Sequence, residues 1–177
     1  DRQPRPHPEE RHEVNVANEL VARSIQLARA IANSGGLVCF ENPPDRGDPH
    51  ATDAATRQLY QPEWAEHAPL WLMPDMISLR EELNLQSVTF PQCSLGSDFE
   101  KYTTLWYSPG LAPILDDLRS CVCLHGSHKA VARGRNKAEK WHSAEAAAYP
   151  ARMNELLATA AVNAVGDLAR MTEPVVR

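Results

Sequence analysis

The sequence lacks the features that mark several large classes of protein. No apolar run among its 177 residues approaches the roughly 20 residues of a membrane-spanning helix, and no segment has the pattern of a secretory signal peptide. There is also no glycine-rich turn after a strand, no Gly-x-Ser-x-Gly motif and no pair of histidines on one helix face. The sequence therefore gives no support to a P-loop nucleotide-binding protein, an α/β-hydrolase or a helical zinc protease.

An excess of positive charge is missing as well. The chain has 18 basic and 23 acidic residues, and its formal net charge is −5, so nothing in the whole-chain charge favours nucleic acid or an anionic membrane. Hydrophobic residues make up 43% and charged residues 23% of the sequence. These values are usual for a globular domain that buries its own core. An anionic partner would have to bind a local cluster of basic residues.

Cysteine is scarce, with four residues in the whole chain. Cys39 and Cys93 lie in stretches that predict buried strands, where a reduced thiol packs as a small hydrophobic group. We interpret the protein as reduced and intracellular, either nuclear or cytoplasmic. The sequence begins with Asp1 and not with methionine, which indicates a processed product or a fragment.

The N-terminal part predicts an extended segment, a helix and a strand in that order. Residues 1–12 contain three prolines and no apolar periodicity, so we expect an extended lead-in. From residue 13 an apolar stripe predicts a helix that ends at Gly35 and Gly36, and residues 37–40 are apolar on both faces. This order is typical of an α/β layer with a parallel sheet. The stripe consists of Val14, Ala17, Val21, Ile25, Ala28 and Ala32, broadened by Leu20, Leu27 and Ile31.

The remaining pattern predicts that residues 13–177 form a single α/β domain. Two β-rich runs, 87–93 and 102–108, flank a turn-like segment and predict a hairpin. A proline-rich loop over 43–69 is longer than compact domains usually contain, and such loops are often functional. Helices are expected after Pro74, from Leu111 and from about residue 143 to the end, with a break or a fresh start at Pro150.

Glu41 and Asn42 follow the first predicted strand and precede Pro43 and Pro44, which turn the chain away. Open α/β sheets bind ligands at the carboxyl ends of their strands, so both side chains are placed to face a substrate. A carboxylate beside an amide suits a nucleobase edge, because Glu accepts from an amino group while Asn donates and accepts. The alternative is a helix N-cap or a turn stabilised by Asn42.

The run CVCLHGSH places Cys121, Cys123, His125 and His128 within eight residues. Cysteine and histidine are the usual ligands of zinc. Structural zinc sites, however, commonly space two pairs of ligands across a loop. Neither helix nor strand geometry easily brings four ligands from so short a run to one point. We therefore assign no metal, and a small zinc-binding protein stays an alternative.

A basic segment follows this run and reverses the sign of the local charge. Such a segment can hold phosphates, and a solvated charged face is the alternative. Lys101, at the start of a predicted strand, is a further phosphate candidate, or a charge that discourages pairing at a sheet edge. The basic residues of the segment are Lys129, Arg133, Arg135, Lys137 and Lys140.

Five short motifs occur along the chain in a recognisable order. They are FENPP, LWLMPDM, VTFPQCSLGSDFEKYTTLWYS, CVCLHGSH and AAAYPARMNELLA. Together they resemble the C-terminal half of a group of DNA cytosine-methyltransferase-like proteins of phages and of mobile elements of algae and other eukaryotes. The resemblance spans roughly residues 13–160. It implies a partial Rossmann-like methyltransferase sheet with flanking helices, in which the C-terminal β-hairpin supplies the last two strands.

The resemblance also implies a function and a set of site residues. Glu41, with Asn42, would contact the ring nitrogen and amino group of a cytosine that has been flipped out of the duplex, because the target atom is unreachable inside it. The cofactor would be S-adenosylmethionine and the partner DNA. The Lys-x-Thr motif of the family falls on Lys101 and Thr103, and Arg133, Arg135 and Lys137 would hold the DNA backbone.

The family's nucleophile and cofactor loop lie before the part that is matched. Neither the Pro-Cys nucleophile motif nor the glycine-rich cofactor turn occurs in this sequence. We therefore expect the chain to need a missing N-terminal half or self-association, since half of a wound sheet leaves an unpaired edge. A non-catalytic, element-derived module that binds DNA or protein is the alternative.

Overall fold

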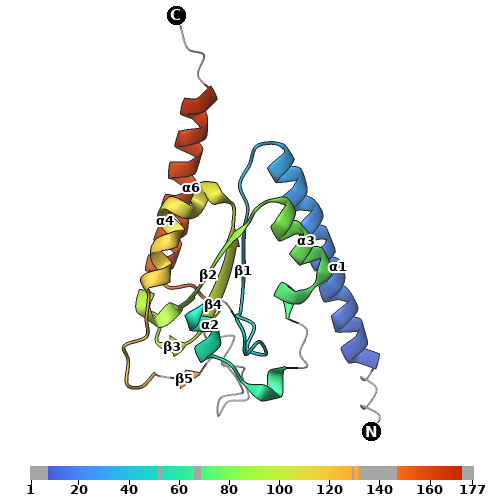
Figure 1. Cartoon of the computed structure of the whole chain (residues 1–177), viewed down its shortest axis with the longest axis vertical. Coiled ribbons are helices and arrows are strands. Elements are labelled where there is room, and N and C mark those ends of the chain that lie inside the picture. The colour runs from blue at the N-terminus through green and yellow to red at the C-terminus, as the bar shows by residue number, and fades with distance from the viewer. Residues whose placement is uncertain (1–7, 52, 66–68, 129, 132–146, 173–177) are drawn as a thin grey trace, which may run out of the picture.

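The chain forms a small sheet between two layers of helices (Figure 1). The computed structural model describes residues 8–51, 53–65, 69–128, 130–131 and 147–172. Helices α4 and α6 cover one face of the sheet, and α1 and α3 cover the other. The described helices are α1 (Pro8–Asn33), α2 (Ala54–Gln58), α3 (Pro74–Glu82), α4 (Ala112–Leu115) and α6 (Ala151–Thr172).

The main sheet has three strands in the order β1–β4–β2. β1 (Cys39–Asn42) and β2 (Gln86–Pro91) both pair antiparallel with β4 (Tyr102–Tyr107), so they run parallel to one another without being neighbours. β2 and β4 form the predicted hairpin. A separate parallel pair joins β3 (Phe99–Glu100) to β5 (Ala130–Val131). Short 3-10 turns connect these elements: η1 (Pro62–Trp64), η2 (Leu70–Leu72), η3 (Gln92–Leu95), η4 (Pro109–Leu111) and η5 (Asp116–Ser120).

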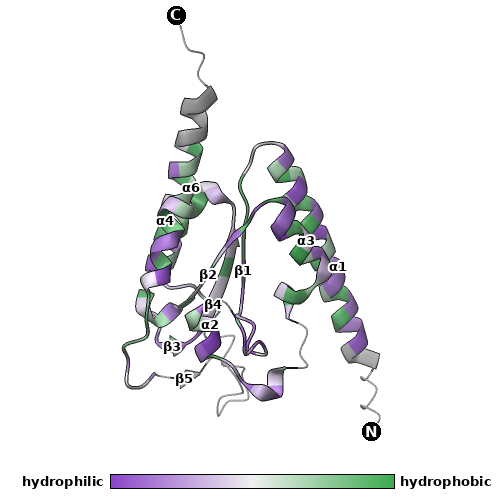
Figure 2. Ribbon diagram, viewed as in Figure 1, coloured by the Kyte–Doolittle hydropathy of each residue, from purple (hydrophilic) through white to green (hydrophobic). Residues whose placement is uncertain are grey.

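Residues 37–40 were predicted to form a strand buried on both faces of a parallel sheet, and this prediction was wrong. In the part of the chain that the structure describes, the main sheet pairs its strands antiparallel. β1 lies at the edge of the sheet, and its four residues range from half-buried to exposed. The strand that is buried on both faces is the central one, β4. β1 also continues through Glu41 and Asn42, which therefore lie inside the strand. Figure 2 shows apolar residues leading into β1 and polar residues in the loop after it.

Two hydrophobic clusters fill the spaces between the layers, one on each face of the sheet. The first joins the β2–β4 hairpin to α4, η5 and α6, and it contains Phe90, Leu105, Leu115 and Met153. The second joins β4 and Val38 to α1 and α3. It contains Ile25, Met76 and Leu79, together with the rings of Trp71 and Trp106, which contact each other at a tilt of 34°. The alternation of side chains along β4 explains this division, because successive residues point to opposite faces.

α1 begins and ends close to the predicted signals. Pro8 is its first residue, so residues 8–12 are helical and not extended as expected; proline is well suited to a helix start because its missing N–H would have no partner there. At the other end Gly35 has a φ of 78°, in the left-handed region, and the N–H of Gly36 donates to the carbonyl of Ile31 at 2.9 Å. The N-terminal half of the predicted stripe, including Val14, is exposed.

The expected long loop over 43–69 contains a helix where described. Asp53 caps α2, since its side chain accepts from the N–H of Thr56 at 2.8 Å. The hydroxyl of Thr56 donates to Thr89 in β2 at 3.0 Å, which fastens α2 to the sheet. At the C-terminus, α6 starts afresh at Ala151, directly after Pro150. The part of the predicted helix between about 143 and 146 falls outside the described residues.

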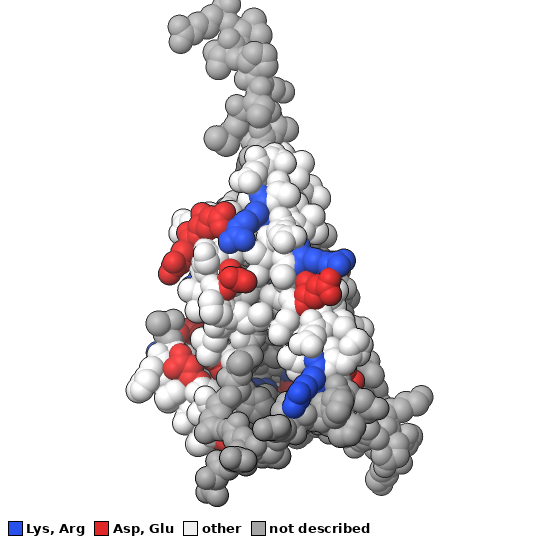
Figure 3. Space-filling model, turned by 90° about the vertical axis from the view of Figure 1, so that its right-hand side faces the viewer, with Lys and Arg blue, Asp and Glu red and all other residues white. Residues whose placement is uncertain are grey.

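The surface in Figure 3 carries acidic and basic side chains side by side among uncharged ones, without a broad area of one sign among the atoms shown in colour. One ion pair joins Arg29 of α1 to Glu82 of α3, with 2.7 Å between Nε and Oε2. All four cysteines are free thiols. None of the described helices has the length and apolar character needed to cross a membrane.

Candidate functional site

Three polar side chains meet where the strands of the main sheet begin or end, at the side that holds the carboxyl ends of β1 and β2. Glu41 lies near the carboxyl end of β1, Gln92 follows the carboxyl end of β2, and Thr103 lies near the start of β4. Because β1 and β2 run in the same direction, their carboxyl ends lie at the same edge, where α/β sheets commonly bind ligands. The sequence predicted Glu41 and Thr103 as site residues, but Gln92 was missed.

The three side chains form a hydrogen-bonded chain with a fixed direction. An ionised Glu41 can only accept, so the hydroxyl of Thr103 donates to its Oε1, at 3.1 Å. The oxygen of Thr103 is then free to accept from Nε2 of Gln92, at 2.6 Å. Thr103 and Gln92 are completely buried. Thr103 is therefore a positioning residue for Glu41, which it reaches from below the surface, and not a side chain that could itself contact a substrate.

Gln92 has an unusual environment on its other side. Its Oε1 atom is buried and has no hydrogen-bond partner among the described residues. A buried carbonyl without a partner costs about 1–3 kcal/mol. An apolar side chain would avoid that cost at this position, so stability alone does not explain a glutamine here. Donation to Thr103, and through it the support of Glu41, does explain it.

Tyr149 completes the support of Glu41 from the other side. Its hydroxyl donates to Oε2 of Glu41 at 2.7 Å. Burial, and then the hydrogen bond to Glu41, raises the pKa of Tyr149 well above 10, so the phenol stays a donor at neutral pH. The ammonium group of Lys101 lies 5.4 Å from the centre of the Tyr149 ring, within the range of a cation–π contact. Tyr149 belongs to the Tyr-Pro motif, the signal by which it could have been found.

A cavity of about 480 Å³ opens beside the Glu41 carboxylate. It follows the edge of β1 from Gly36 to Glu41 and is bounded on the other side by α6 and Tyr149. Its wall is mostly aliphatic, with Leu105, Leu111, Leu115, Leu157, Ala160, Ala161 and Val165. A half-buried carboxylate held by two hydroxyls at the end of an apolar groove suits a flat ligand that carries a hydrogen-bond donor at its edge.

Asn42 does not join Glu41 in this cavity. Cys39 and Glu41 line it, whereas Phe40 packs in the cluster on the α1–α3 face. Because side chains alternate along a strand, Asn42 is directed to the same face as Phe40 and away from Glu41. The turn bonds of the following loop come from Asp45 and Asp48, which accept from the N–H groups of Gly47 and His50 at 2.8 and 2.7 Å. The geometry thus brings Glu41, and not the pair, to the site.

Three of the four residues in the Cys/His run come together in the structure, and the fourth, Cys121, does not. Cys123, His125 and His128 converge, and the fourth member of the group is Cys93 from η3. Cys121 instead packs against the core beneath α4 and α6. Cys93 was predicted in a buried strand; it is buried, but it lies in the turn after β2, next to Gln92. No spacing in the sequence could have paired it with the run, because the hairpin brings it there.

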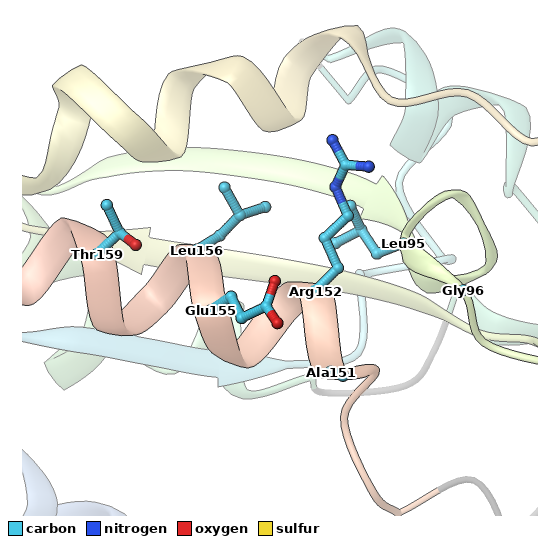
Figure 4. A pocket seen from close by; sticks show the side chains of 7 residues that line it. All are labelled: Leu95, Gly96, Ala151, Arg152, Glu155, Leu156 and Thr159. Atoms are coloured by element: carbon cyan, nitrogen blue, oxygen red, sulfur yellow. The ribbon is translucent and has the colours of Figure 1, made fainter.

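A second hollow, of about 640 Å³, lies between the end of η3 and the first turns of α6. Figure 4 shows Arg152 and Glu155 reaching away from α6 in different directions, with Leu95 and Leu156 between the helix and the hairpin. The charged side chains here are exposed. Among the described residues, the side chains of this hollow make no fixed polar contacts like those of the Glu41 site.

Urea unfolding at alkaline pH tests the hydrogen bond from Tyr149 to Glu41. Tyr107 and Tyr149 both have a raised pKa, chiefly through burial and then through hydrogen bonds to Asp116 and Glu41. A raised folded-state pKa contributes stability that is complete below the ordinary tyrosine value of about 10 and is lost as the pH rises above it. We expect the free energy of unfolding in urea to fall as the pH rises above about 10, and to fall less steeply in Tyr149→Phe. Tyr60→Phe serves as the control, because the Tyr60 side chain is exposed. An equal slope in Tyr149→Phe and the unaltered chain contradicts the contact.

The structure brings four of these side chains to one place: Glu41, Thr103, Tyr149 and Lys101. The predicted phosphate-binding residues of the basic segment lie outside the described residues; they are Lys129, Arg133, Arg135, Lys137 and Lys140.

Comparisons with models of protein families, with curated proteins and with solved structures found no match. The geometry of the site and the motifs of the sequence therefore carry the functional conclusion.

Proposed function

We propose that this chain is part of a DNA cytosine-methyltransferase-like protein, in which Glu41 recognises a cytosine flipped out of the duplex. The observation that carries the proposal is the Glu41 carboxylate, held by the hydroxyls of Thr103 and Tyr149 at the end of an apolar groove. The motif order of the sequence supports the same function. The partial Rossmann-like sheet belongs to the proposal too. β1 and β2 run in the same direction, and β4 lies antiparallel between them; mixed sheets of this kind are common among doubly wound folds.

The chemistry of Glu41 fits cytosine better than thymine. Cytosine presents an amino group at C4, from which a carboxylate accepts, whereas thymine presents an oxygen there, which repels a carboxylate. Both Glu41 oxygens already accept one hydroxyl hydrogen bond, so the carboxylate is fixed in orientation and keeps lone pairs for a ligand. The aliphatic wall beside it can cover the base face, as in other pockets that read flipped bases.

S-adenosylmethionine does not fit the described part of this site. The cofactor carries ribose hydroxyls and an amino-acid group, which need several hydrogen-bonding side chains or backbone groups. The groove beside β1 offers a mostly aliphatic wall, with Glu41 and Tyr149 at one end. The resemblance puts both the cofactor loop and the nucleophile in a preceding segment. We therefore derive no methyl-transfer step for this chain and limit its role to base recognition and contact with DNA.

The free edge of β1 indicates where the rest of the sheet would pair. β1 pairs with β4 on one side, and no described strand pairs with its other side. The groove along that edge is aliphatic, and Val165 of α6, which lines it, is 64% exposed. An unpaired strand next to an apolar surface is a template for association. We propose that the strand before β1 in the complete sheet pairs with this edge and covers the Val165 end of the groove, and that a second copy does so in the isolated chain, while the Glu41 end stays open for the base.

A charge placed in the groove should therefore separate the copies. We expect light scattering of the isolated chain to give a mass above the 19.7 kDa of one copy, and Val165→Glu to return it to a monomer. Val162→Glu is the matched control, because Val162 is on the same helix and 70% exposed but does not line the groove. A monomer before any substitution, or equal effects of both variants, is inconsistent with this docking surface.

The test of the proposed function is selectivity for one base. The chain should bind a duplex that displays an unpaired cytosine more tightly than one that displays an unpaired thymine, and Glu41→Gln should remove the difference. This result separates base recognition from the alternative of a module that binds only the DNA backbone, because backbone contacts carry no base preference.

A further inference from the structure

Four zinc-type ligands from two distant parts of the chain meet next to the Glu41 site. Cys93 belongs to η3, while Cys123, His125 and His128 belong to the segment after η5. Each residue offers one ligand atom, and these four atoms all lie within 4.8 Å of one another. The group is independent of the proposed function, because none of its members contacts Glu41 in the hydrogen bonds described above.

Two of the distances within the group lie close to the edges of a tetrahedral zinc site. Bonds of about 2.3 Å to sulfur and 2.0 Å to nitrogen put neighbouring sulfur and nitrogen ligands about 3.5 Å apart in a tetrahedron. The Sγ atom of Cys123 lies 3.8 Å from Nδ1 of His125 and 3.4 Å from Nε2 of His128. The two imidazole rings have centres 5.2 Å apart and are tilted by 55° to each other. They therefore approach a common point without stacking on one another.

The local backbone holds Cys93 in place before any metal binds. The N–H of Gly96 donates to the carbonyl of Cys93 at 3.1 Å, and the N–H of Ser97 donates to the carbonyl of Gln92 at 3.2 Å. Gly96 has a φ of 99°, a left-handed conformation that glycine adopts without strain. One ligand is thus fixed on the hairpin, and the other three come to it on a separate segment.

The segment that carries the other ligands is poorly anchored by its own apolar side chains. Val122 and Leu124 are 58% and 87% exposed. β5, which follows this segment, pairs with β3 over only two residues. A bond that fixes this segment to η3 would close a long loop, which is where a metal clip stabilises most in theory.

We propose that Cys93, Cys123, His125 and His128 bind one Zn²⁺ ion as a structural site. Two thiolates and two imidazoles are a usual ligand set for zinc, and four protein ligands leave no open position for catalysis. On binding, the two thiols release their protons to solvent, because the thiolate is the ligand. The ion fixes residues 121–128 to the hairpin end, directly before the basic segment that starts at Lys129.

The test is titration of the full chain, reduced and freed of metal, first with Zn²⁺ alone and then with Co²⁺. We expect one equivalent of Zn²⁺ to bind, and Co²⁺ to give the absorption of a tetrahedral site with sulfur-to-metal charge transfer. His125→Ala should weaken Zn²⁺ binding by at least about tenfold. Because His125 is exposed, this variant is expected to fold even if the buried variant Cys93→Ser does not.

Cys121→Ser is the matched control, since it lies in the same run but outside the group. It should bind Zn²⁺ as the unaltered chain does, whereas Cys93→Ser should bind Zn²⁺ more weakly and, when saturated with Co²⁺, lack the charge-transfer intensity of one thiolate. The proposal is overturned if the reduced chain binds no Zn²⁺, or if His125→Ala binds it unchanged. It is equally overturned if Cys121→Ser loses the ion while a folded Cys93→Ser keeps it.

Discussion

Thr103→Val is expected to lower the free energy of unfolding by about 2–5 kcal/mol. Valine has nearly the shape of threonine, so packing in the completely buried site changes little. The loss of the hydroxyl, however, leaves two groups without their partner: Nε2 of Gln92 and Oε1 of Glu41. Each unpartnered group costs about 1–3 kcal/mol, and a charged one costs more. Urea unfolding of the purified chain measures the difference.

Thr103→Ser is the matched control for this prediction. Serine keeps the hydroxyl and loses one methyl group, so we expect a loss of about 1 kcal/mol. Gln92→Leu combined with Thr103→Val should be less destabilising than the two single changes together, because the double variant removes a donor and its acceptor at once. If Thr103→Val is as stable as Thr103→Ser, the hydrogen-bonded chain does not hold Glu41.

A role in positioning predicts an effect beyond stability. Thr103→Val should also reduce the preference for cytosine over thymine, since Glu41 then keeps the support of Tyr149 alone. Thr103→Ser should retain the preference. A residue that only stabilised the core would change the unfolding curve and leave the base preference of the folded protein unaltered.

Local patterns predicted the elements that depend on neighbouring residues. Gly35 and Gly36 end α1 as expected, and the two β-rich runs around residues 94–101 form a hairpin. The pairing of β1 depends on residues more than 60 positions away, for example Glu41 opposite Leu105. Apolar residues on both faces of a short run do not reveal such a partner, so the position of β1 at the edge could not be predicted.

Only part of the site was predicted, because some of its residues also act through partners that are distant in the sequence. Glu41 was recognisable because it follows a predicted strand at the end where α/β sheets bind ligands, and Thr103 entered through the family motif. Gln92 and Cys93 gave no signal of their own, since both act through residues that the fold brings from elsewhere. Asn42 was predicted beside Glu41 from adjacency in sequence. Inside a strand, adjacency has the opposite consequence, because neighbouring side chains point to different faces.

The measurement that tests the central claim most directly is the cytosine-over-thymine preference with and without the Glu41 carboxylate. Two short duplexes, identical except for one unpaired cytosine or thymine, are titrated with the full chain at low salt, where contacts to phosphates are strongest. We expect cytosine to be bound about tenfold more tightly, in line with about 1–3 kcal/mol for reading one base. Glu41→Gln should abolish the difference, since an amide can both donate and accept.

Glu155→Gln is the matched control for this measurement. It changes the net charge by the same amount but lies on α6 beside the second hollow, away from the Glu41 groove. Base recognition by Glu41 predicts a cytosine preference in the unaltered chain and in Glu155→Gln, and none in Glu41→Gln. Equal affinity of the unaltered chain for both duplexes, or a preference that survives in Glu41→Gln, contradicts it.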